Sequence, residues 1–372
     1  MKKKYVFVMN IPSPYRIHLL DAMWRQLNER GLDMHVHFMA KGYKGRPKSW
    51  LSPKIDFPHT YWRDYGFGEF HFNPGLIFHL FCNTPDYLVC GSSFDTFTGI
   101  GVMVMSRAKV KMCWLEGNTK TPGRMTGIIG WFKRFIMSRC KYAPVPGMDA
   151  AKYVEMHRAL AKGNMPKPVI LPNLVDERRF AHCEGTDMSI DGCDDKVLCL
   201  VPARLEPVKG LIPFLNELTP DILSGWRIVI MGQGSLRHEI DQTITSRGLS
   251  DCVKIVDYVP YDEMPKWYVK ADLVLLPSLQ DANPLTSVEA LHSGKALALS
   301  CMAGNVEEAV TDGRNGWVLP VNDKEAFAAK LKEIFSTTKS RLAEMGERSK
   351  RENAQFWDTK RAIERFLDET LG

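Results

Sequence analysis

"ADLVLLPSLQDANPLTSVEALHSGKALALS", residues 271–300, joins an apolar run, a polar loop, a helical stretch and a second apolar run. Asn283 can cap the helix, Pro284 suits its first position, and Gly294 can end it. Short apolar runs joined by a helix are typical of parallel strands with a crossover connection. The stretch therefore predicts a β-α-β unit.

The same alternation of apolar runs and helical stretches extends along the whole chain. The expected strands of the first half are YVFVMN (5–10), MHVHFMA (34–40), YLVCG (87–91), VKMCWLE (110–116) and PVILPN (168–173). Those of the second half are VLCLVPA (197–203), WRIVIMG (226–232), VKIVDYV (253–259), LVLLPS (273–278), ALALS (296–300) and GWVLP (316–320). Strands covered by helices on both faces are apolar throughout. The pattern predicts an α/β fold of doubly wound parallel sheets.

The chain length indicates two domains, because 372 residues exceed what one hydrophobic core usually supports. The best boundary is the polar, Gly- and Asp-rich "AHCEGTDMSIDGCDDK". We expect an N-terminal domain at 1–180, a linker at 181–195 and a second domain at 196–350. The end of the chain, 351–372, has an amphipathic helical pattern and is expected to cross back to the first domain.

The composition is that of a globular protein, with 45% apolar and 25% charged residues. Its nine cysteines include no C-x-x-C pair and no zinc-binding pattern, which suits a reducing compartment. Asn10 and Pro12 interrupt the apolar N-terminus, so we interpret it as a β-strand rather than a signal peptide. No apolar run approaches the length of a membrane span, and we expect a cytoplasmic protein.

The net charge of +6 is unevenly distributed. Residues 1–180 hold 27 Lys and Arg against 13 Asp and Glu, a net charge of +14, whereas the remainder carries −8. Such an asymmetry is consistent with a face that meets polyanions or an anionic membrane, and equally with an uneven solvated surface.

Cations follow the first strand of the second half, in "VPARLEPVKGL". Arg204 and Lys209 lie where this strand leads into a helix. Two cations beside a helix N-terminus are suited to a diphosphate, although two solvated surface cations would give the same pattern. The loop lacks the G-x-x-x-x-G-K-[ST] pattern, which disfavours a P-loop NTPase.

Glycines mark the next strand-to-helix turn, "IVIMGQGSLRHEI". Gly232 and Gly234 allow a ligand to approach the backbone closely. Without a third glycine, however, G-x-G is a weak dinucleotide signal, and a tight turn explains it as well. A dehydrogenase is therefore disfavoured.

Two carboxylates, Asp281 and Glu289, accompany the helix of the opening stretch. Carboxylates accept hydrogen bonds, and the diol of a ribose or hexose supplies two donors. Singly, Glu289 could be a helix-surface charge and Asp281 a turn residue. Together with Arg204 and Lys209 at strand ends, they indicate a site where cations hold phosphates and carboxylates hold hydroxyls.

These motifs resemble the retaining, nucleotide-sugar-dependent glycosyltransferases of family 4. The resemblance covers about 172–320, through LPNLVDERRF, ARLEPVKG, MGQG, the opening stretch and AGNVEEAVTDGRNGWVLP. It implies the GT-B fold, in which two Rossmann-like domains of doubly wound parallel sheets face each other across a cleft. The donor would be UDP- or GDP-linked, with no metal or other cofactor.

The resemblance also implies roles in the second domain. Arg204 and Lys209 would hold the donor diphosphate, and Glu289 matches the second glutamate of the E-x7-E motif, expected on the ribose. Asp281 stands in place of the first glutamate, which contacts the transferred sugar. The further donor-binding positions are Gly232, Tyr258, Val259, Asn283, Pro284 and Leu285.

The first domain is expected to hold the acceptor. A subset of the family shares the P-Y-R loop formed by Pro14, Tyr15 and Arg16. Arg16 could hold an acceptor phosphate or be a first-turn helix residue. The cleft histidine of many relatives is absent after VKMCWLEGN, where Glu116 is the nearest polar candidate for a catalytic role.

We therefore expect retaining transfer of a hexose to a saccharide or lipid-linked saccharide, in the synthesis of a cell-surface polysaccharide or glycoconjugate. An inactive homologue acting as a scaffold is the alternative, given Asp281 and the absent histidine. Nucleic acid is not an expected partner, since no recognised RNA-binding motif accompanies the basic residues.

Two basic segments with aromatic residues, 41–54 and 123–141, suggest contact with the inner face of an anionic membrane. The second includes Ile128, Ile129 and Trp131 beside Arg124 and Arg139. A core-packing helix with a solvated basic face would give the same pattern. We expect a cytoplasmic enzyme that binds the membrane peripherally.

Overall fold

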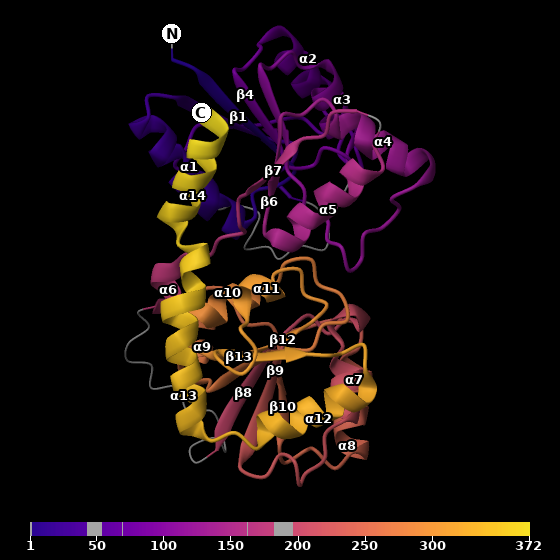
Figure 1. The fold of residues 1–372 in the computed structure, drawn as a ribbon, viewed down its shortest axis with the longest axis vertical. Helices are drawn as coiled ribbons and strands as arrows, with labels where there is room; N and C mark the ends of the chain where they lie inside the picture. The colour runs from indigo at the N-terminus through magenta and orange to yellow at the C-terminus, as the bar shows by residue number, and fades with distance from the viewer. Residues whose placement is uncertain (1, 43–53, 69, 162, 182–195) are drawn as a thin grey trace. The chain divides into compact units, whose positions relative to one another are not determined.

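The computed structural model describes residues 2–42, 54–68, 70–161, 163–181 and 196–372. The chain divides into two compact units (Figure 1). Unit 1 comprises Met1–Val175 and Thr359–Gly372, and unit 2 comprises Asp176–Asp358. Each unit is built on one parallel sheet.

The sheet of unit 1 has the strand order β3-β2-β1-β4-β5-β6-β7. Its strands are β1 (Lys4–Met9), β2 (Asp33–Phe38), β3 (His59–Tyr61), β4 (Tyr87–Cys90), β5 (Val110–Cys113), β6 (Tyr142–Val145) and β7 (Lys167–Ile170). The order reverses between β1 and β4, which pair with each other. This reversal is a topological switch point, beyond which open parallel sheets usually bind their ligands.

Helices cover both faces of this sheet (Figure 1). One face carries α1 (Pro14–Glu29) and α14 (Thr359–Leu371), which pack against each other. The other carries α2 (Pro74–Cys82), α3 (Phe97–Met105), α4 (Gly127–Met137) and α5 (Met148–Ala159). Apolar residues of the second set share a core with the strands. Unit 1 is thus doubly wound.

The sheet of unit 2 has the order β10-β9-β8-β11-β12-β13, with its switch point between β8 and β11. Its strands are β8 (Val197–Pro202), β9 (Trp226–Met231), β10 (Val253–Val256), β11 (Leu273–Leu276), β12 (Ala296–Ser300) and β13 (Gly316–Leu319). The connecting helices are α6 (Glu177–Ala181), α7 (Leu211–Asn216), α8 (Arg237–Ser246), α9 (Met264–Lys270), α10 (Leu285–His292) and α11 (Val306–Ala309). The helices α12 (Lys324–Phe335) and α13 (Lys339–Arg348) follow β13.

Each of the eleven predicted apolar runs overlaps a strand, and the described residues form two further strands that were not predicted. β3 is a three-residue strand with the sequence HTY, too short and too polar to be recognised. β6 contains Pro144, a residue that argues against a strand because it lacks a backbone N–H. The apolar pattern therefore predicts the other eleven described strands, but not a short polar strand or one that contains proline.

The units differ in detail from the expected domain limits. Unit 2 begins at Asp176 rather than 196, because Phe180 of α6 packs against Tyr268, with ring centroids 5.7 Å apart. The expected linker, 181–195, lies outside the described residues except for Ala181. Thr359–Gly372, which contains α14, groups with unit 1.

The expected cap of α10 is wrong. The helix begins at Leu285 with Pro284 at the N-cap position, and no side chain caps it. Asn283 therefore lies one residue too early to accept a hydrogen bond from the first turn. The expected end is confirmed, because Gly294 follows the C-cap Ser293 with a φ of 65°.

Among the helices that the structure describes, none has the length and apolar character needed to cross a bilayer.

Candidate functional site

Most of the predicted site residues lie beyond the carboxyl ends of strands, in two sets. In unit 2, Lys209 follows β8 and Asp281 follows β11, the two strands of its switch point. In unit 1, Arg16 follows β1, beside the switch point, and Glu116 follows β5. Each unit thus presents polar side chains at the edge of its sheet where ligands usually bind.

The structure brings Lys209 and Asp281 together. The Nζ of Lys209 donates a hydrogen bond to Oδ2 of Asp281 in an ion pair. The two side chains are 17% and 14% exposed, so both are largely shielded from water while remaining accessible. A cation and a hydroxyl-accepting carboxylate therefore stand side by side at one point of the sheet edge.

Backbone contacts hold these two loops in register. The carbonyl of Val208 accepts hydrogen bonds from the N–H groups of Leu279 and Gln280 at 2.9 and 3.1 Å. Gly210, with a φ of 67°, lies so close to Pro277 that a Cβ atom would sit 2.2 Å from its carbonyl oxygen. Only glycine fits there, which explains the K-G pair at the end of ARLEPVKG.

Arg204 lies five residues before Lys209 and is exposed. The helix expected directly after it is interrupted: a 3₁₀ turn at Pro207–Lys209 precedes α7, which has six residues. A short helix contributes a small dipole, so the positive charge at this point comes from the side chains of Arg204 and Lys209.

Gly232 is required by the fold. A Cβ atom there would lie 2.0 Å from the carbonyl oxygen of Ala203, and the φ of Gly232 is 149°. The Glu206 carboxylate also accepts hydrogen bonds from Ser235, through its hydroxyl at 2.8 Å and its N–H at 3.2 Å. The glycine therefore lets the loops after β8 and β9 pack together, and a ligand is not needed to explain it.

Glu289 is buried in α10, with 6% of the residue exposed. Its Oε2 accepts a hydrogen bond of 2.7 Å from the hydroxyl of Tyr268. Burial raises the pKa of Glu289 to about 7, although the bond from Tyr268 acts in the opposite direction. Tyr268 was not predicted as a site residue, since its only signal is its place in the apolar pattern of α9.

The residues around the start of α10 line the same sheet edge. Pro284 is buried, whereas Asn283 and Leu285 are half-buried. Among the described residues, Oδ1 of Asn283 is a buried atom without a hydrogen-bond partner. Tyr258, which is 47% exposed, and Val259 follow β10 directly.

In unit 1, Arg16 is the centre of a cluster. It is a first-turn residue of α1 and only 6% exposed. Its Nη2 donates to Oε1 of Glu116, and its guanidinium lies over the ring of Trp114 at 3.9 Å from the centroid. Pro14 occupies the first position of the helix and Tyr15 lies beside the guanidinium at 5.1 Å.

The same cluster includes Asn173, which the sequence analysis did not select. Its Nδ2 donates to Oε1 of Glu116 at 3.3 Å. Nη1 of Arg16 and Oδ1 of Asn173 are buried atoms for which the described part of the chain offers no hydrogen-bond partner. Buried polar groups are usually satisfied, so one unused donor and one unused acceptor around Glu116 favour a polar ligand.

A cavity of about 300 Å³ opens beside this cluster, at the carboxyl ends of β4 and β5. Trp114, Glu116 and Lys133 contribute to its lining, and Nζ of Lys133 donates to the hydroxyl of Tyr153 at 3.3 Å. Lys133 was predicted as part of a membrane-facing segment, whereas the structure places it in this cavity. Ser93 and Asp95 are further lining residues that the sequence analysis missed.

The two predicted membrane segments differ in outcome. The first, 41–54, lies outside the described residues apart from 41, 42 and 54. The second contains α4, whose Ile136 and Met137 are buried in the core, whereas Ile128 is 85% exposed. The core-packing interpretation therefore holds for the end of this helix, and membrane contact of its exposed start stays a prediction.

Solved structures match this architecture along almost the whole chain. HepE of Anabaena, determined in complex with UDP, has a TM-score of 0.74 at 16% identity and covers 99% of both chains. Sucrose-phosphate synthase of Thermosynechococcus elongatus has a TM-score of 0.72 at 12% identity, covering 100% of this chain and 98% of the other. The chain has the GT-B fold.

The match to a family model lies within unit 2 of this GT-B chain. Residues 191–352 match the family model described as glycosyl transferases group 1. The amylovoran biosynthesis glycosyltransferase AmsK of Erwinia amylovora is 33% identical over 149 residues, which is 38% of this chain and 36% of that protein. WcaL of Salmonella typhimurium, named for colanic acid biosynthesis, is 26% identical over 224 residues, 58% of this chain and 53% of WcaL. The chain thus matches about a third to a half of the length of these relatives.

Proposed function

We propose that this GT-B protein is a retaining glycosyltransferase that moves a hexose from a nucleoside diphosphate sugar to a saccharide or lipid-linked saccharide. The observation that carries the proposal is the pairing of Lys209 with Asp281 at the switch point of unit 2. The similarity of residues 191–352 to group 1 glycosyl transferases supports it. The presence of UDP in the HepE structure supports a nucleotide-sugar donor.

The donor site is assigned to the loops of unit 2. Arg204 and Lys209 would hold the diphosphate, while Asp281 accepts hydrogen bonds from the transferred sugar and Glu289 from the ribose. Gly232, Tyr258, Val259 and Asn283–Leu285 would contribute to the walls of the site. Because cations supply the positive charge, the proposal requires no metal ion.

Transfer breaks the bond between the anomeric carbon and the phosphate oxygen, whose electron pair stays on that oxygen. The acceptor hydroxyl oxygen bonds to the anomeric carbon on the same face, and its proton passes to the leaving phosphate. Negative charge therefore develops on the diphosphate, beside Lys209 and Arg204. Preorganised donors at such a position are often the largest catalytic contribution.

The acceptor site is assigned to unit 1. Glu116 is oriented by Arg16 and Asn173, and its carboxylate is 43% exposed, so it can accept a hydrogen bond from an acceptor hydroxyl. Pro14 and Tyr15 shape the start of α1 beside it. The relatives named for amylovoran and colanic acid biosynthesis support a role in making a cell-surface polysaccharide.

The test is release of nucleoside diphosphate from UDP- and GDP-sugars by the double variant Arg204→Ala/Lys209→Ala. Loss of one such donor typically lowers the rate by ~10²–10³, so at least that loss is expected. Wild-type turnover should persist in EDTA. The matched control is Lys266→Ala, an exposed lysine of α9.

Near wild-type turnover by the double variant would overturn the site assignment. A wild-type protein that binds nucleotide sugars but releases no product, with or without saccharide acceptors, would favour the alternative of an inactive homologue that acts as a scaffold.

A further inference from the structure

Exposed apolar side chains are concentrated in unit 1. Among the described residues, 15 of the 19 large hydrophobic side chains that are exposed belong to this unit, and 12 lie between Tyr65 and Trp131. Monomeric proteins rarely expose contiguous apolar patches of this kind unless they bind something. The region from 65 to 131 therefore requires an explanation that glycosyl transfer does not supply.

Four of these side chains lie around a short antiparallel bridge, which we call the hairpin. Phe67 and Phe70 pair as an antiparallel bridge, with mutual N–H to carbonyl hydrogen bonds of 3.2 and 3.1 Å. Their side chains are 80% and 55% exposed. Tyr65 and Phe72 flank them, 57% and 42% exposed, and the N–H of Tyr65 donates to the carbonyl of Phe72 at 2.9 Å. Four exposed aromatic rings thus lie on described residues, 65–68 and 70–72, whose backbone groups are hydrogen-bonded to each other.

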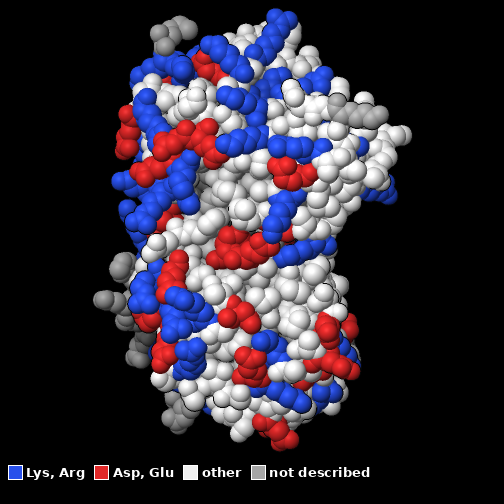
Figure 2. All heavy atoms as spheres, in the orientation of Figure 1, with Lys and Arg blue, Asp and Glu red and all other residues white. Residues whose placement is uncertain are grey.

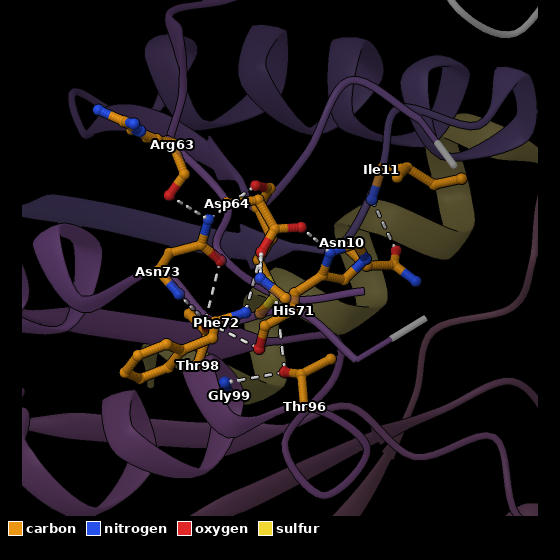
Figure 3. A network of polar contacts seen from close by, with 12 residues as sticks. Asn10, Ile11, Arg63, Asp64, His71, Phe72, Asn73, Thr96, Thr98 and Gly99 are labelled. Atoms are coloured by element: carbon orange, nitrogen blue, oxygen red, sulfur yellow. Dashed lines mark hydrogen bonds and ion pairs between the residues drawn. The ribbon is translucent and has the colours of Figure 1, made fainter. Parts of the chain in front are cut away.

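A polar network holds the base of this hairpin (Figure 3). Oδ1 of Asp64 accepts hydrogen bonds from the N–H groups of Gly66 and Phe72, both at 2.9 Å, and Oδ2 lies 2.6 Å from Nδ1 of His71. His71 is 1% exposed. Although burial raises the pKa of Asp64, its hydrogen bonds prevail and hold that pKa below its ordinary value. One ionised carboxylate therefore ties the two ends of the hairpin together.

The network continues into the core through Asn73, which is fully buried. Its Nδ2 donates to the carbonyls of Met39 and Arg63 at 2.8 and 3.0 Å, and its Oδ1 accepts from Thr98 at 2.9 Å. The hairpin is thus fixed to the loop after β2 and to the first turn of α3. Ordering a loop costs conformational entropy, and exposing its aromatic rings adds no stability in water. A rigid base under exposed rings is expected where those rings bind something.

The aromatic surface extends from the hairpin to the neighbouring helices. The ring of Phe72 meets that of Phe97 at 6.4 Å, and Phe97, at the start of α3, is 62% exposed. α3 packs against α4, where Ile128 and Trp131 are 85% and 59% exposed. In Figure 2 a largely uncharged surface covers the α3–α4 side of unit 1, whereas charged residues crowd the side of α1 and α14.

Three arginines, Arg63, Arg124 and Arg139, lie beside the residues of this surface. Residues 63–141 hold ten Lys and Arg against five Asp and Glu. The guanidinium of Arg63 lies over the ring of Tyr65 at 4.9 Å, and that of Arg139 lies over Phe135 at 3.7 Å. Arg124 and Arg139 are exposed at the two ends of α4. Aromatic rings beside arginines are the composition of surfaces that sit at the boundary between lipid headgroups and acyl chains.

We propose that the hairpin of Tyr65, Phe67, Phe70 and Phe72, together with Phe97 and the exposed end of α4, inserts into an anionic lipid surface. The apolar rings enter the upper acyl region, and the surrounding cations contact acidic headgroups. Unit 1 would thereby be held at the surface where a lipid-linked acceptor resides. The proposal stands on unit 1 alone and does not depend on the assignment of glycosyl transfer.

The test is flotation of the full chain with vesicles of phosphatidylcholine, with and without phosphatidylglycerol. We expect binding to the anionic vesicles that weakens with salt, because headgroup attraction is screened. Phe67→Ser/Phe70→Ser should lower the partition coefficient by about tenfold or more, since two apolar rings no longer leave water. Ile128→Ser/Trp131→Ser is a second, independent variant expected to act in the same direction.

Val269→Ser in unit 2, an exposed apolar residue of α9, should bind as the wild type does. Both double variants should keep the wild-type unfolding temperature and the wild-type release of nucleoside diphosphate in lipid-free solution. Absence of wild-type binding at low salt would overturn the proposal, as would unchanged binding by both double variants. Concentration-dependent dimers that the Phe67→Ser/Phe70→Ser variant abolishes would assign the surface to a second copy instead. Turnover of the Arg204→Ala/Lys209→Ala variant is measured separately. Its loss or persistence bears on the donor site and not on lipid binding.

Discussion

Units 1 and 2 share one design of sheet and differ in what they expose. Both place a switch point between the first strand and the strand that reverses the order. At the switch point of unit 2, Lys209 is paired with Asp281. Among the described residues, unit 2 has four of the exposed large hydrophobic side chains. Unit 1 carries fifteen of them. The same fold therefore carries a shielded cation–carboxylate pair at the switch point of unit 2 and most of the exposed apolar side chains in unit 1.

The buried titratable groups of the two units also differ, with opposite consequences for stability. In unit 2, burial raises the pKa of Glu289 to about 7. In unit 1, burial first, and then the charges of His35 and His79, lower the pKa of His37 to about 3. Both groups are neutral in the folded protein over a pH range where the unfolded chain carries their charge. Acid should thus favour the fold of unit 2 and disfavour that of unit 1.

The largest of these effects is expected for Glu289→Gln. An unfolded glutamate ionises at pH 4.5 and the folded one at about 7, so the wild-type free energy of unfolding should fall by about 3 kcal/mol as the pH rises between these values. Glutamine still accepts the hydrogen bond from Tyr268 but does not titrate. The difference in unfolding free energy between variant and wild type, measured in urea from pH 4.5 to 7.5, should grow by that amount.

Glu239→Gln, at an exposed position of α8, is the control and should leave the slope unchanged. A Glu289→Gln protein with the wild-type pH slope would show that this carboxyl group is ionised in the folded protein. In that case the opposite pH dependence expected for the stability of the two units would be wrong for unit 2.

A smaller effect is expected for His37→Gln in unit 1. Nδ1 of His37 accepts a hydrogen bond of 3.1 Å from Trp62. The ring packs against those of His35 and His79, with centroids 4.7 and 5.4 Å away. Because the unfolded chain binds a proton below pH 6.5 and the folded one does not, the wild type should lose about 2 kcal/mol between pH 6.5 and 5.

The glutamine variant should lack that loss when urea unfolding is followed over the same pH range. The cavity beside His37 is also lined by Lys4, Asp33 and His35, and burial lowers the pKa of His35 as well. The control is His238→Gln, an exposed residue of unit 2. Equal acid sensitivity of His37→Gln and wild type would remove the contrast between the units.

The sheets could be predicted because strands that are buried on both faces consist largely of apolar residues. The loop residues Lys209 and Asp281 could be selected as ligand-binding candidates, since each follows an apolar run. Their direct contact could not be predicted, because it depends on the close approach of Gly210 to Pro277. Side-chain pairing between distant loops is set by packing, which leaves no periodic pattern.

The polar network under the aromatic hairpin was harder still to predict. Asp64, His71 and Asn73 lie outside the predicted strands, and their partners include backbone groups distant in the sequence. Tyr268 and Asn173 were missed for a similar reason: each lies in or beside a recognisable element, but its contact with a predicted site residue comes from packing between elements distant in the sequence. By contrast, Arg16 and Glu116 were selected individually, and the structure shows that they form one cluster.

The central claim is that the donor binds to unit 2 and the acceptor to unit 1. It is tested most directly by calorimetric titration with whichever nucleoside diphosphate, UDP or GDP, raises the unfolding temperature more. Lys209→Ala should weaken its binding about tenfold or more, because a charge-assisted hydrogen bond to phosphate is lost. Arg16→Gln, which alters only the cluster around Glu116, should bind it as the wild type does. Unchanged affinity in Lys209→Ala, or an equal loss in Arg16→Gln, would contradict the account.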